Sequence, residues 1–199
     1  MTAVGMRPVW VALALTACSG AADPEPPAEP PAPAPAAEAA PEVAAESPWI
    51  DVDATSVRET LREHPAPALL VNVWSTWCEP CVEEMPDVIA TARRYEGQGL
   101  GLALIAAEPP TRRAEALSFL REQGAPEPSY FKTGGDDAFI EALHPEWSGA
   151  LPATLLLDRE RRVVHFWPEP VDEAALRGPI EAHLRTARPG TGTEAEAGR

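Results

Sequence analysis

The sequence is poor in basic residues. It has 16 lysines and arginines against 31 aspartates and glutamates, which gives a formal net charge of -15. Nucleic-acid binding depends on lysine and arginine side chains that neutralise phosphates, so this balance argues against nucleic acid as a partner. An acidic surface favours solubility and encounters with basic partners, and it carries little further functional information.

The chain begins with a short apolar run, Val9 to Leu15, which lacks the length to span a bilayer. The run follows Arg7 and ends in Leu15-Thr16-Ala17-Cys18, a pattern typical of a secretory signal. This ending is similar to the lipobox of bacterial lipoprotein signals. The similarity implies cleavage after residue 17 and a lipid on Cys18 that anchors the protein to the membrane. An ordinary signal peptide followed by an unrelated cysteine is the alternative.

The next part of the chain lacks the residues that build a core. From Ala21 to Pro48 it is almost entirely alanine, proline and glutamate, without a basic residue. Because proline removes hydrogen-bond donors and the acidic side chains repel one another, we expect an extended, disordered tether. The sequence thus predicts a signal peptide at 1–17, the tether at 18–48, one folded domain at 49–187 and a disordered tail at 188–199.

Apolar patterns in the domain alternate between strands and helices. Continuous apolar runs predict buried strands, and apolar residues at intervals of three and four predict amphipathic helices. Strand-helix units followed by a hairpin and a last helix make a mixed α/β sheet covered on both faces. The predicted strands are 68–75, 100–107, 154–157 and 163–167, and the predicted helices are 79–95, 111–123, 136–143 and 172–184.

Cysteine is scarce, and two of the three cysteines stand together as Cys78-Glu-Pro-Cys81. The strand before Cys78 and the helix after it place this residue at a helix start, where unpaired N–H groups stabilise a thiolate. Cys78 is therefore the expected nucleophile. Two intervening residues bring Cys81 close enough to resolve a mixed disulfide formed at Cys78. The spacing predicts a redox-active disulfide that works by two-step thiol-disulfide exchange.

Two structural interpretations of this pair are weaker. A permanent disulfide would close too short a loop to restrict the unfolded chain much. A zinc site would need two more ligands, and the histidines are not in paired metal spacing. We therefore expect no metal, and no cofactor beyond the redox-active disulfide of Cys78 and Cys81. The histidines are His64, His144, His165 and His183.

The segment from Asn72 to Pro86, Asn-Val-Trp-Ser-Thr-Trp-Cys-Glu-Pro-Cys-Val-Glu-Glu-Met-Pro, resembles the TlpA and ResA group of exported bacterial thioredoxin-like oxidoreductases. The resemblance extends through Gly149-Ala-Leu-Pro-Ala-Thr-Leu-Leu-Leu-Asp158 and covers about residues 49–187. It implies a thioredoxin-like fold with an insertion before the strand that follows a cis-proline. It also implies that Pro152 is cis, lies against the sulfurs and turns the backbone of Leu151 toward a substrate strand.

The resemblance suggests roles for other residues near the pair. Asn72 stands where ordinary thioredoxins have a buried aspartate that accepts the proton of the resolving thiol, so another group must accept it. Glu84 matches the group's motif glutamate three residues after Cys81, where a partly buried carboxyl group with a raised pKa could be the base. A solvated helix charge is the alternative for Glu84, and Glu83 is expected at the surface. Trp77 is expected to flank the sulfur as a docking surface.

These features predict an enzyme, a membrane-tethered thiol-disulfide oxidoreductase. The charge of Glu79 between the cysteines opposes thiolate formation and favours a reductant over an oxidant. The resemblance implies that the partners are disulfide-containing envelope proteins, as in cytochrome c maturation or copper-site assembly, and a membrane electron donor for re-reduction. The domain would lie in the periplasm or extracytoplasmic space. A Cu(I) chaperone that uses both thiolates and a catalytically idle interaction module are the alternatives.

Overall fold

The computed structural model of the chain describes residues 48–187. The predicted signal peptide, the tether up to residue 47, the tail and Cys18 lie outside the described residues. In chain order the elements are β1 (Trp49–Val52), α1 (Val57–Glu63), β2 (Ala68–Trp74), α2 (Glu79–Glu96), β3 (Leu100–Ala106), the 3-10 helix η1 (Pro110–Arg112), α3 (Arg113–Glu122), β4 (Ser129–Lys132), α4 (Asp136–Leu143), β5 (Ala153–Leu157), β6 (Val163–Trp167) and α5 (Glu173–Thr186).

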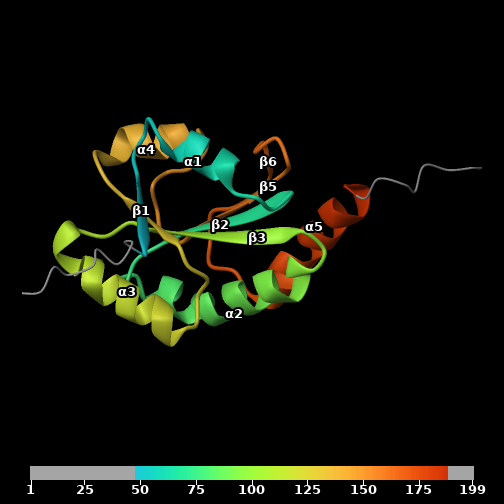
Figure 1. Ribbon diagram of the computed structural model, residues 1–199, viewed down its shortest axis with the longest axis horizontal. Coiled ribbons are helices and arrows are strands. Elements are labelled where there is room, and N and C mark those ends of the chain that lie inside the picture. Colours follow the sequence, from blue (N-terminus) through green and yellow to red (C-terminus); the bar gives the residue numbers. More distant parts are fainter. Residues whose placement is uncertain (1–47, 188–199) are drawn as a thin grey trace, which may run out of the picture. The chain divides into compact units, whose positions relative to one another are not determined.

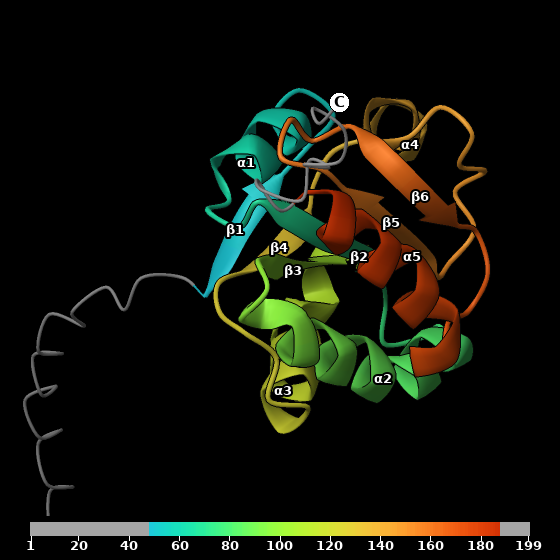
Figure 2. The same ribbon diagram turned by 90° about the vertical axis from the view of Figure 1, so that its right-hand side faces the viewer.

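The strands form one mixed sheet in the order β1-β4-β3-β2-β5-β6. Strand β2 is parallel to β3 and antiparallel to β5, and β5 forms an antiparallel hairpin with β6. Helices α1 and α4 lie on one face of the sheet, and α2, α3 and α5 lie on the other (Figures 1 and 2). The predicted α/β class, with a mixed sheet covered on both faces, is confirmed.

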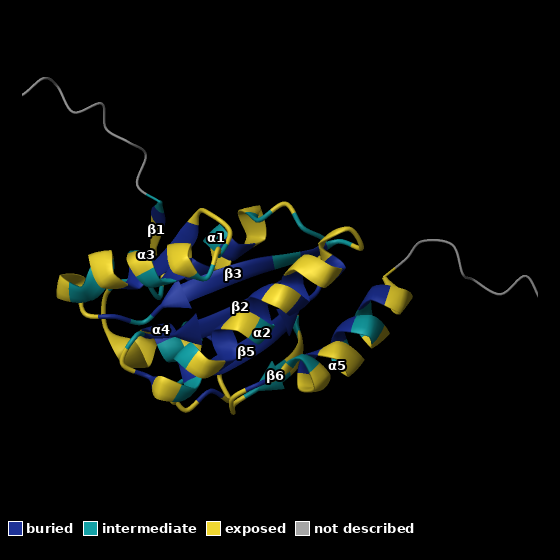
Figure 3. Ribbon diagram, turned by 90° about the horizontal axis from the view of Figure 1, so that it is seen from below, coloured by how far each residue is buried: buried dark blue, intermediate teal, exposed yellow. Residues whose placement is uncertain are grey.

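Strand β2 lies in the middle of the sheet, and all seven of its residues are buried. Side chains alternate between the two faces of a strand. Accordingly Leu69, Val71 and Val73 join the core beneath α1 and α4, whereas Leu70 and Trp74 join the core beneath α2 and α5. Figure 3 shows the result, with buried strands between helices whose outer sides are exposed. The same alternation puts Asn72 on the α2 side.

The predicted helices and strands agree with the structure to within two residues at each end. The predicted helix at 111–123 is divided in the structure into η1 and α3, and three further elements lie where none was predicted: β1, α1 and β4. Strands β1 and β4 have four residues each and pair with one another in parallel at one edge of the sheet. Helix α1 has seven residues and buries two of them, Val57 and Leu61. Each element is too short to show a clear apolar period.

None of the helices between residues 48 and 187 combines the length and the hydropathy needed to cross a bilayer.

Candidate active site

Cys78 and Cys81 form a disulfide, with 5.2 Å between their Cα atoms. Strand β2 ends at Trp74, a short turn follows, and Cys78 is the N-cap residue of α2. The Cys78 N–H donates to the Ser75 carbonyl at 3.3 Å, and the Val82 N–H donates to the Cys78 carbonyl at 3.1 Å. The predicted placement of the cysteine pair between a buried strand and a helix is therefore confirmed.

The two cysteines differ in access to solvent. Cys78 keeps 6% of its surface exposed, and Cys81 is completely buried. Trp77, directly before Cys78, is 57% exposed, whereas Trp74 is buried. A visiting disulfide can therefore approach Cys78 beside a large exposed aromatic surface, while Cys81 is covered.

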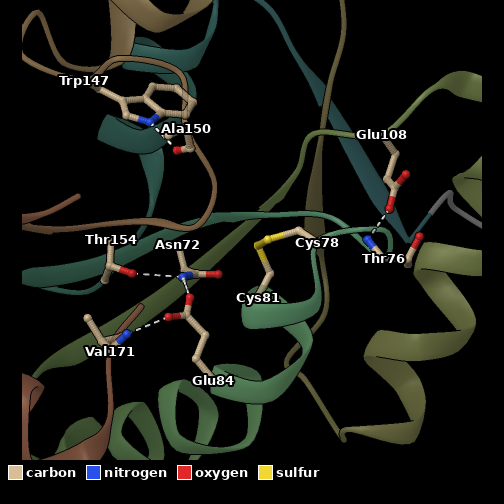
Figure 4. Close-up of a disulfide and its surroundings, with 10 residues drawn as sticks. All are labelled: Asn72, Thr76, Cys78, Cys81, Glu84, Glu108, Trp147, Ala150, Thr154 and Val171. Atoms are coloured by element: carbon tan, nitrogen blue, oxygen red, sulfur yellow. Dashed lines mark hydrogen bonds between the residues drawn. A yellow bond between two sulfur atoms is a disulfide. The ribbon is translucent and has the colours of Figure 1, made fainter. Parts of the chain in front are cut away.

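A buried network lies next to the disulfide (Figure 4). The Asn72 side-chain amide donates from Nδ2 to Glu84 Oε1 at 2.7 Å and to Thr154 Oγ1 at 2.9 Å. Glu84 Oε2 accepts from the Val171 N–H at 2.7 Å. The network joins four parts of the fold. Asn72 of β2 faces α2, which carries Glu84, and it is in register with Thr154 of the antiparallel strand β5. Val171 lies in the segment before α5. Sequence reasoning missed Thr154 and Val171.

Glu84 is a buried carboxyl group, with 4% of the residue exposed. Burial raises its pKa above the ordinary value, and the hydrogen bonds from the Val171 amide and from Asn72 partly oppose that rise in pKa. The raised pKa predicted from the sequence is confirmed, and the alternative of a solvated helix charge is wrong. Glu83, one residue earlier, is exposed as predicted.

The peptide bond between Leu151 and Pro152 is cis, as the resemblance implied. Pro152 is buried and Leu151 is half-buried, and β5 begins at the next residue. The loop before them is held by Trp147, whose indole N–H donates to the Ala150 carbonyl at 2.8 Å (Figure 4). The substrate-binding roles of Leu151, Pro152 and Trp77 stay predictions.

A second buried carboxyl group, Glu108, lies close to the redox pair and was missed from the sequence. Its Oε1 accepts a hydrogen bond from the Thr76 N–H, two residues before Cys78 (Figure 4). A signal was present, because Glu108 lies two residues after β3, a buried strand that runs parallel to the strand leading to Cys78. Ligand and catalytic groups gather at the carboxyl ends of such strands.

Within residues 48–187, no three His, Cys, Asp or Glu side chains come together in a way that could hold a metal ion. The expected absence of a metal and of a further cofactor stays a prediction. The lipidation site at Cys18 lies outside the described residues and also stays a prediction.

Comparison with known proteins identifies the relatives of this chain. Residues 35–178 match the Redoxin family. The thiol-disulfide oxidoreductase ResA of Geobacillus thermodenitrificans strain NG80-2 is 25% identical over 129 residues, which cover 65% of this chain and 68% of that protein. The thiol:disulfide interchange protein HelX of Rhodobacter capsulatus is 28% identical over 141 residues, 70% of this chain and 69% of that protein.

A solved structure shows the same fold. The DsbF homologue from Corynebacterium diphtheriae superposes with a TM-score of 0.51 and 22% sequence identity, and the match covers 58% of this chain and 71% of that one. The fold, the cysteine pair at the start of α2 and these relatives lead to one assignment. The chain belongs to the Redoxin family and is a thiol-disulfide oxidoreductase with a thioredoxin-like fold.

Proposed function

We propose that this enzyme reduces disulfides of specific exported proteins, with Cys78 as the attacking thiolate, Cys81 as the resolving thiol and Glu84 as the acceptor of the Cys81 proton. One observation carries the proposal. Cys78 caps α2 with part of its surface exposed, whereas Cys81 is fully buried on the side of the pair where Glu84 lies (Figure 4). This asymmetry suits a first attack by Cys78 and a second by Cys81.

The reaction has two exchanges of sulfur bonds. In the reduced enzyme the Cys78 thiolate attacks one sulfur of the substrate disulfide, whose S–S bond breaks to release one substrate thiolate, which takes up a proton. Cys81 then gives its proton to Glu84 and attacks Cys78 Sγ. The mixed disulfide breaks, the second substrate sulfur leaves as a thiolate that takes up a proton from solvent, and the Cys78–Cys81 disulfide forms. The substrate is then a dithiol. Two electrons have passed from enzyme to substrate, and a dithiol donor must return them.

Glu84 fits the role of proton acceptor in two ways. Its raised pKa keeps its affinity for a proton higher than that of an exposed glutamate. It also borders a surface hollow of about 400 Å³, together with Pro80, Glu83, Asp87 and Val171. A proton received from Cys81 can therefore pass to solvent through this hollow.

The reducing direction is supported by Glu79. This acidic residue stands in the first turn of α2 between the two cysteines, where its charge opposes the build-up of negative charge on Cys78. Strong oxidants of this type depend on an unusually stable thiolate. A negative neighbour therefore favours a pair that gives electrons to its partner.

Substrate docking is assigned to the surface around Cys78. Trp77 offers an exposed apolar ring, and the half-buried Leu151 lies just before β5. An extended substrate segment would pair with the backbone at Leu151 while its disulfide meets Cys78. The resemblance suggests apocytochrome c or a copper-assembly protein as the owner of that segment.

The site of action is proposed to be the cell envelope, with a lipid on Cys18 as the anchor and residues 18–48 as the tether. Incorporation of radiolabelled palmitate into the intact chain, with fractionation of membranes, tests this. Label and membrane attachment that disappear in Cys18→Ser support the anchor. A Cys18→Ser protein that is labelled and membrane-bound as before contradicts it.

The redox proposal is tested by turnover. The purified protein, supplied with dithiothreitol, should accelerate reduction of the insulin disulfides, and both Cys78→Ser and Cys81→Ser should lose this activity. Titration of the reduced protein and of the two serine variants with Cu(I) checks the copper-chaperone alternative. Tight stoichiometric Cu(I) binding that is lost in both variants would favour that alternative. Insulin reduction that persists in both serine variants would overturn the proposal.

A further inference from the structure

Glu108 lies where the hydrogen-bonded ladder between β2 and β3 ends. The last rung is the bond from the Ala107 N–H to the Trp74 carbonyl, at 2.8 Å. Beyond it the chain after β2 turns toward Cys78, and the next N–H that faces the β3 side is that of Thr76. Glu108 supplies the acceptor for this N–H from its side chain. The carboxyl group thus continues the ladder one step past the strand.

The side chain of Glu108 is buried although such burial is costly for a carboxyl group. Its side chain is 0% exposed, although it belongs to a loop. Burying a carboxyl group costs free energy unless hydrogen bonds compensate, so an acid here needs a function that a smaller or apolar residue cannot serve. Among residues 48–187 its second oxygen, Oε2, has no hydrogen-bond partner, and Arg112 Nε lies 4.0 Å from it. Arg112, the last residue of η1, donates to Glu115 at 3.0 and 2.6 Å, so the hydrogen bond from the Thr76 N–H is the closer contact of the Glu108 carboxyl group.

The turn that Glu108 holds is the one that delivers the proposed nucleophile. Thr76 is half-buried, Trp77 is exposed and Cys78 caps α2. The turn from β2 to α2 is held by two hydrogen bonds. Glu108 accepts from the Thr76 N–H, and the Cys78 N–H donates to the Ser75 carbonyl. Sulfur placement relative to the helix terminus decides how well the N–H groups stabilise a thiolate.

We infer that Glu108 is a positioning residue of the redox centre, acting through the Thr76 amide on the placement of Cys78. This inference rests on the proposed role of Cys78 as nucleophile. The hydrogen bond needs an acceptor oxygen but no negative charge. Glutamine should therefore preserve the function of Glu108, and a residue of similar length without an acceptor oxygen should lose it. Glu108→Gln and Glu108→Met are therefore the matched pair.

The test measures alkylation of Cys78 by iodoacetamide in the reduced full-length protein across a range of pH, with the position of the label read by mass spectrometry. Glu108→Met should slow alkylation of Cys78 at neutral pH about tenfold and move the midpoint of the pH profile upward. The reason is that a displaced sulfur is less well stabilised as a thiolate by the N–H groups at the start of α2. Glu108→Gln should remain within about twofold of the parent, because it keeps the acceptor. The equilibrium with glutathione should shift in Glu108→Met and not in Glu108→Gln.

A control separates positioning from general loss of stability. Asp158 is another buried carboxyl group, which accepts from the Arg162 N–H at 2.9 Å at the far end of β5. Asp158→Ala should lower the melting temperature and leave the alkylation profile of Cys78 unchanged. A profile that shifts equally in Asp158→Ala and Glu108→Met overturns the inference, as does Glu108→Gln behaving like Glu108→Met.

The parent protein provides the test if Glu108→Met does not fold. The Thr76 amide hydrogen should then be protected from exchange in nuclear magnetic resonance spectra of the parent, although Thr76 belongs to a turn. Exchange at the rate of an open loop overturns the inference. A parent protein whose Cys78 is unreactive would instead defeat the proposed function, so the two failures are distinguishable.

Discussion

The side-chain amide of Asn72 and the carboxyl group of Glu84 are joined by a buried hydrogen bond of 2.7 Å next to the redox disulfide. The other amide atom of Asn72, Oδ1, is turned toward Cys81 (Figure 4) and accepts no hydrogen bond within the described part of the chain. Asn72 therefore fixes Glu84 on the Cys81 side of the pair. The amide of Asn72 donates a hydrogen bond to the carboxyl group of Glu84. An aspartate at position 72 would instead be a second acidic group.

Glu84→Gln should slow the second step of exchange. Without the carboxylate, the Cys81 thiol must lose its proton to solvent, and the resolving rate at neutral pH should fall about tenfold or more. The first attack by Cys78 should keep its rate. Stopped-flow fluorescence with a peptide disulfide separates the two steps.

Glu83→Gln is the matched control for that experiment, since Glu83 is the exposed neighbour on the same helix. It removes the same charge and should leave both rates within about twofold of the parent, as expected for a surface substitution. Equal slowing in both variants, or unchanged resolution in Glu84→Gln, would assign Glu84 a structural role.

The stability of the protein should depend on pH through Glu84. Its folded-state pKa is raised above the ordinary value of 4.5, mainly by burial. Such a group adds stability below its unfolded pKa, and this contribution is lost as the pH rises through the folded pKa. The free energy of unfolding of the parent minus that of Glu84→Gln should therefore fall between pH 4 and pH 8. Urea unfolding at several pH values measures it, and a rising difference would contradict the raised pKa.

Asn72→Asp should create two carboxyl groups in contact. Two buried carboxylates repel each other and lack solvation, and alkaline pH drives both groups toward this ionised state. The variant should therefore lose about 2 kcal/mol or more of stability at alkaline pH. At pH 4 a shared proton should relieve most of this loss. The double variant Asn72→Asp with Glu84→Gln should recover stability at pH 8. A single variant as stable as the parent at pH 8 would show that the two side chains are not in contact.

Arg161 should be a stability residue without influence on the redox step. Its guanidinium donates to the carbonyls of Leu61, His64 and Ala66, at 2.8, 2.5 and 2.8 Å, and ties the end of α1 to the β5–β6 turn. Arg161→Gly should cost about 2 to 4 kcal/mol through these buried acceptors. Arg161→Ala should cost about 1 kcal/mol more, because φ at this position is 61° and glycine adopts that region readily.

Denaturant unfolding measures both variants, and insulin reduction at low temperature checks the redox step. The turn lies at the far end of β5 from Pro152, so activity should match that of the parent while the protein is folded. Glycine and alanine variants of equal stability would contradict the backbone part of the argument.

The sequence was sufficient for the elements that carry the site. Strand β2 and helix α2 have long, regular apolar patterns, so the position of Cys78 between them could be predicted. The same patterns predicted the fold class. The edge strand β1 could not be predicted, because its pattern has two exposed residues between two buried ones and depends on pairing with a strand 80 residues later.

The contacts inside the site were less predictable. Glu84 could be identified by resemblance and helical spacing, but its bonds to Asn72 and to the Val171 amide depend on tertiary packing. Glu108 also carried no motif of its own. Its importance depends on one hydrogen bond to Thr76, which follows from how two parallel strands end.

Trapping of the mixed disulfide tests the central claim most directly. Reduced Cys81→Ser and Cys78→Ser proteins are mixed with a disulfide-bonded peptide, and covalent complexes are measured by mass spectrometry under non-reducing conditions. The account predicts that Cys81→Ser accumulates a complex joined through Cys78, whereas Cys78→Ser forms little or none. Equal trapping by both variants, or trapping by Cys78→Ser alone, would contradict the assignment of Cys78 as nucleophile and Cys81 as resolving thiol.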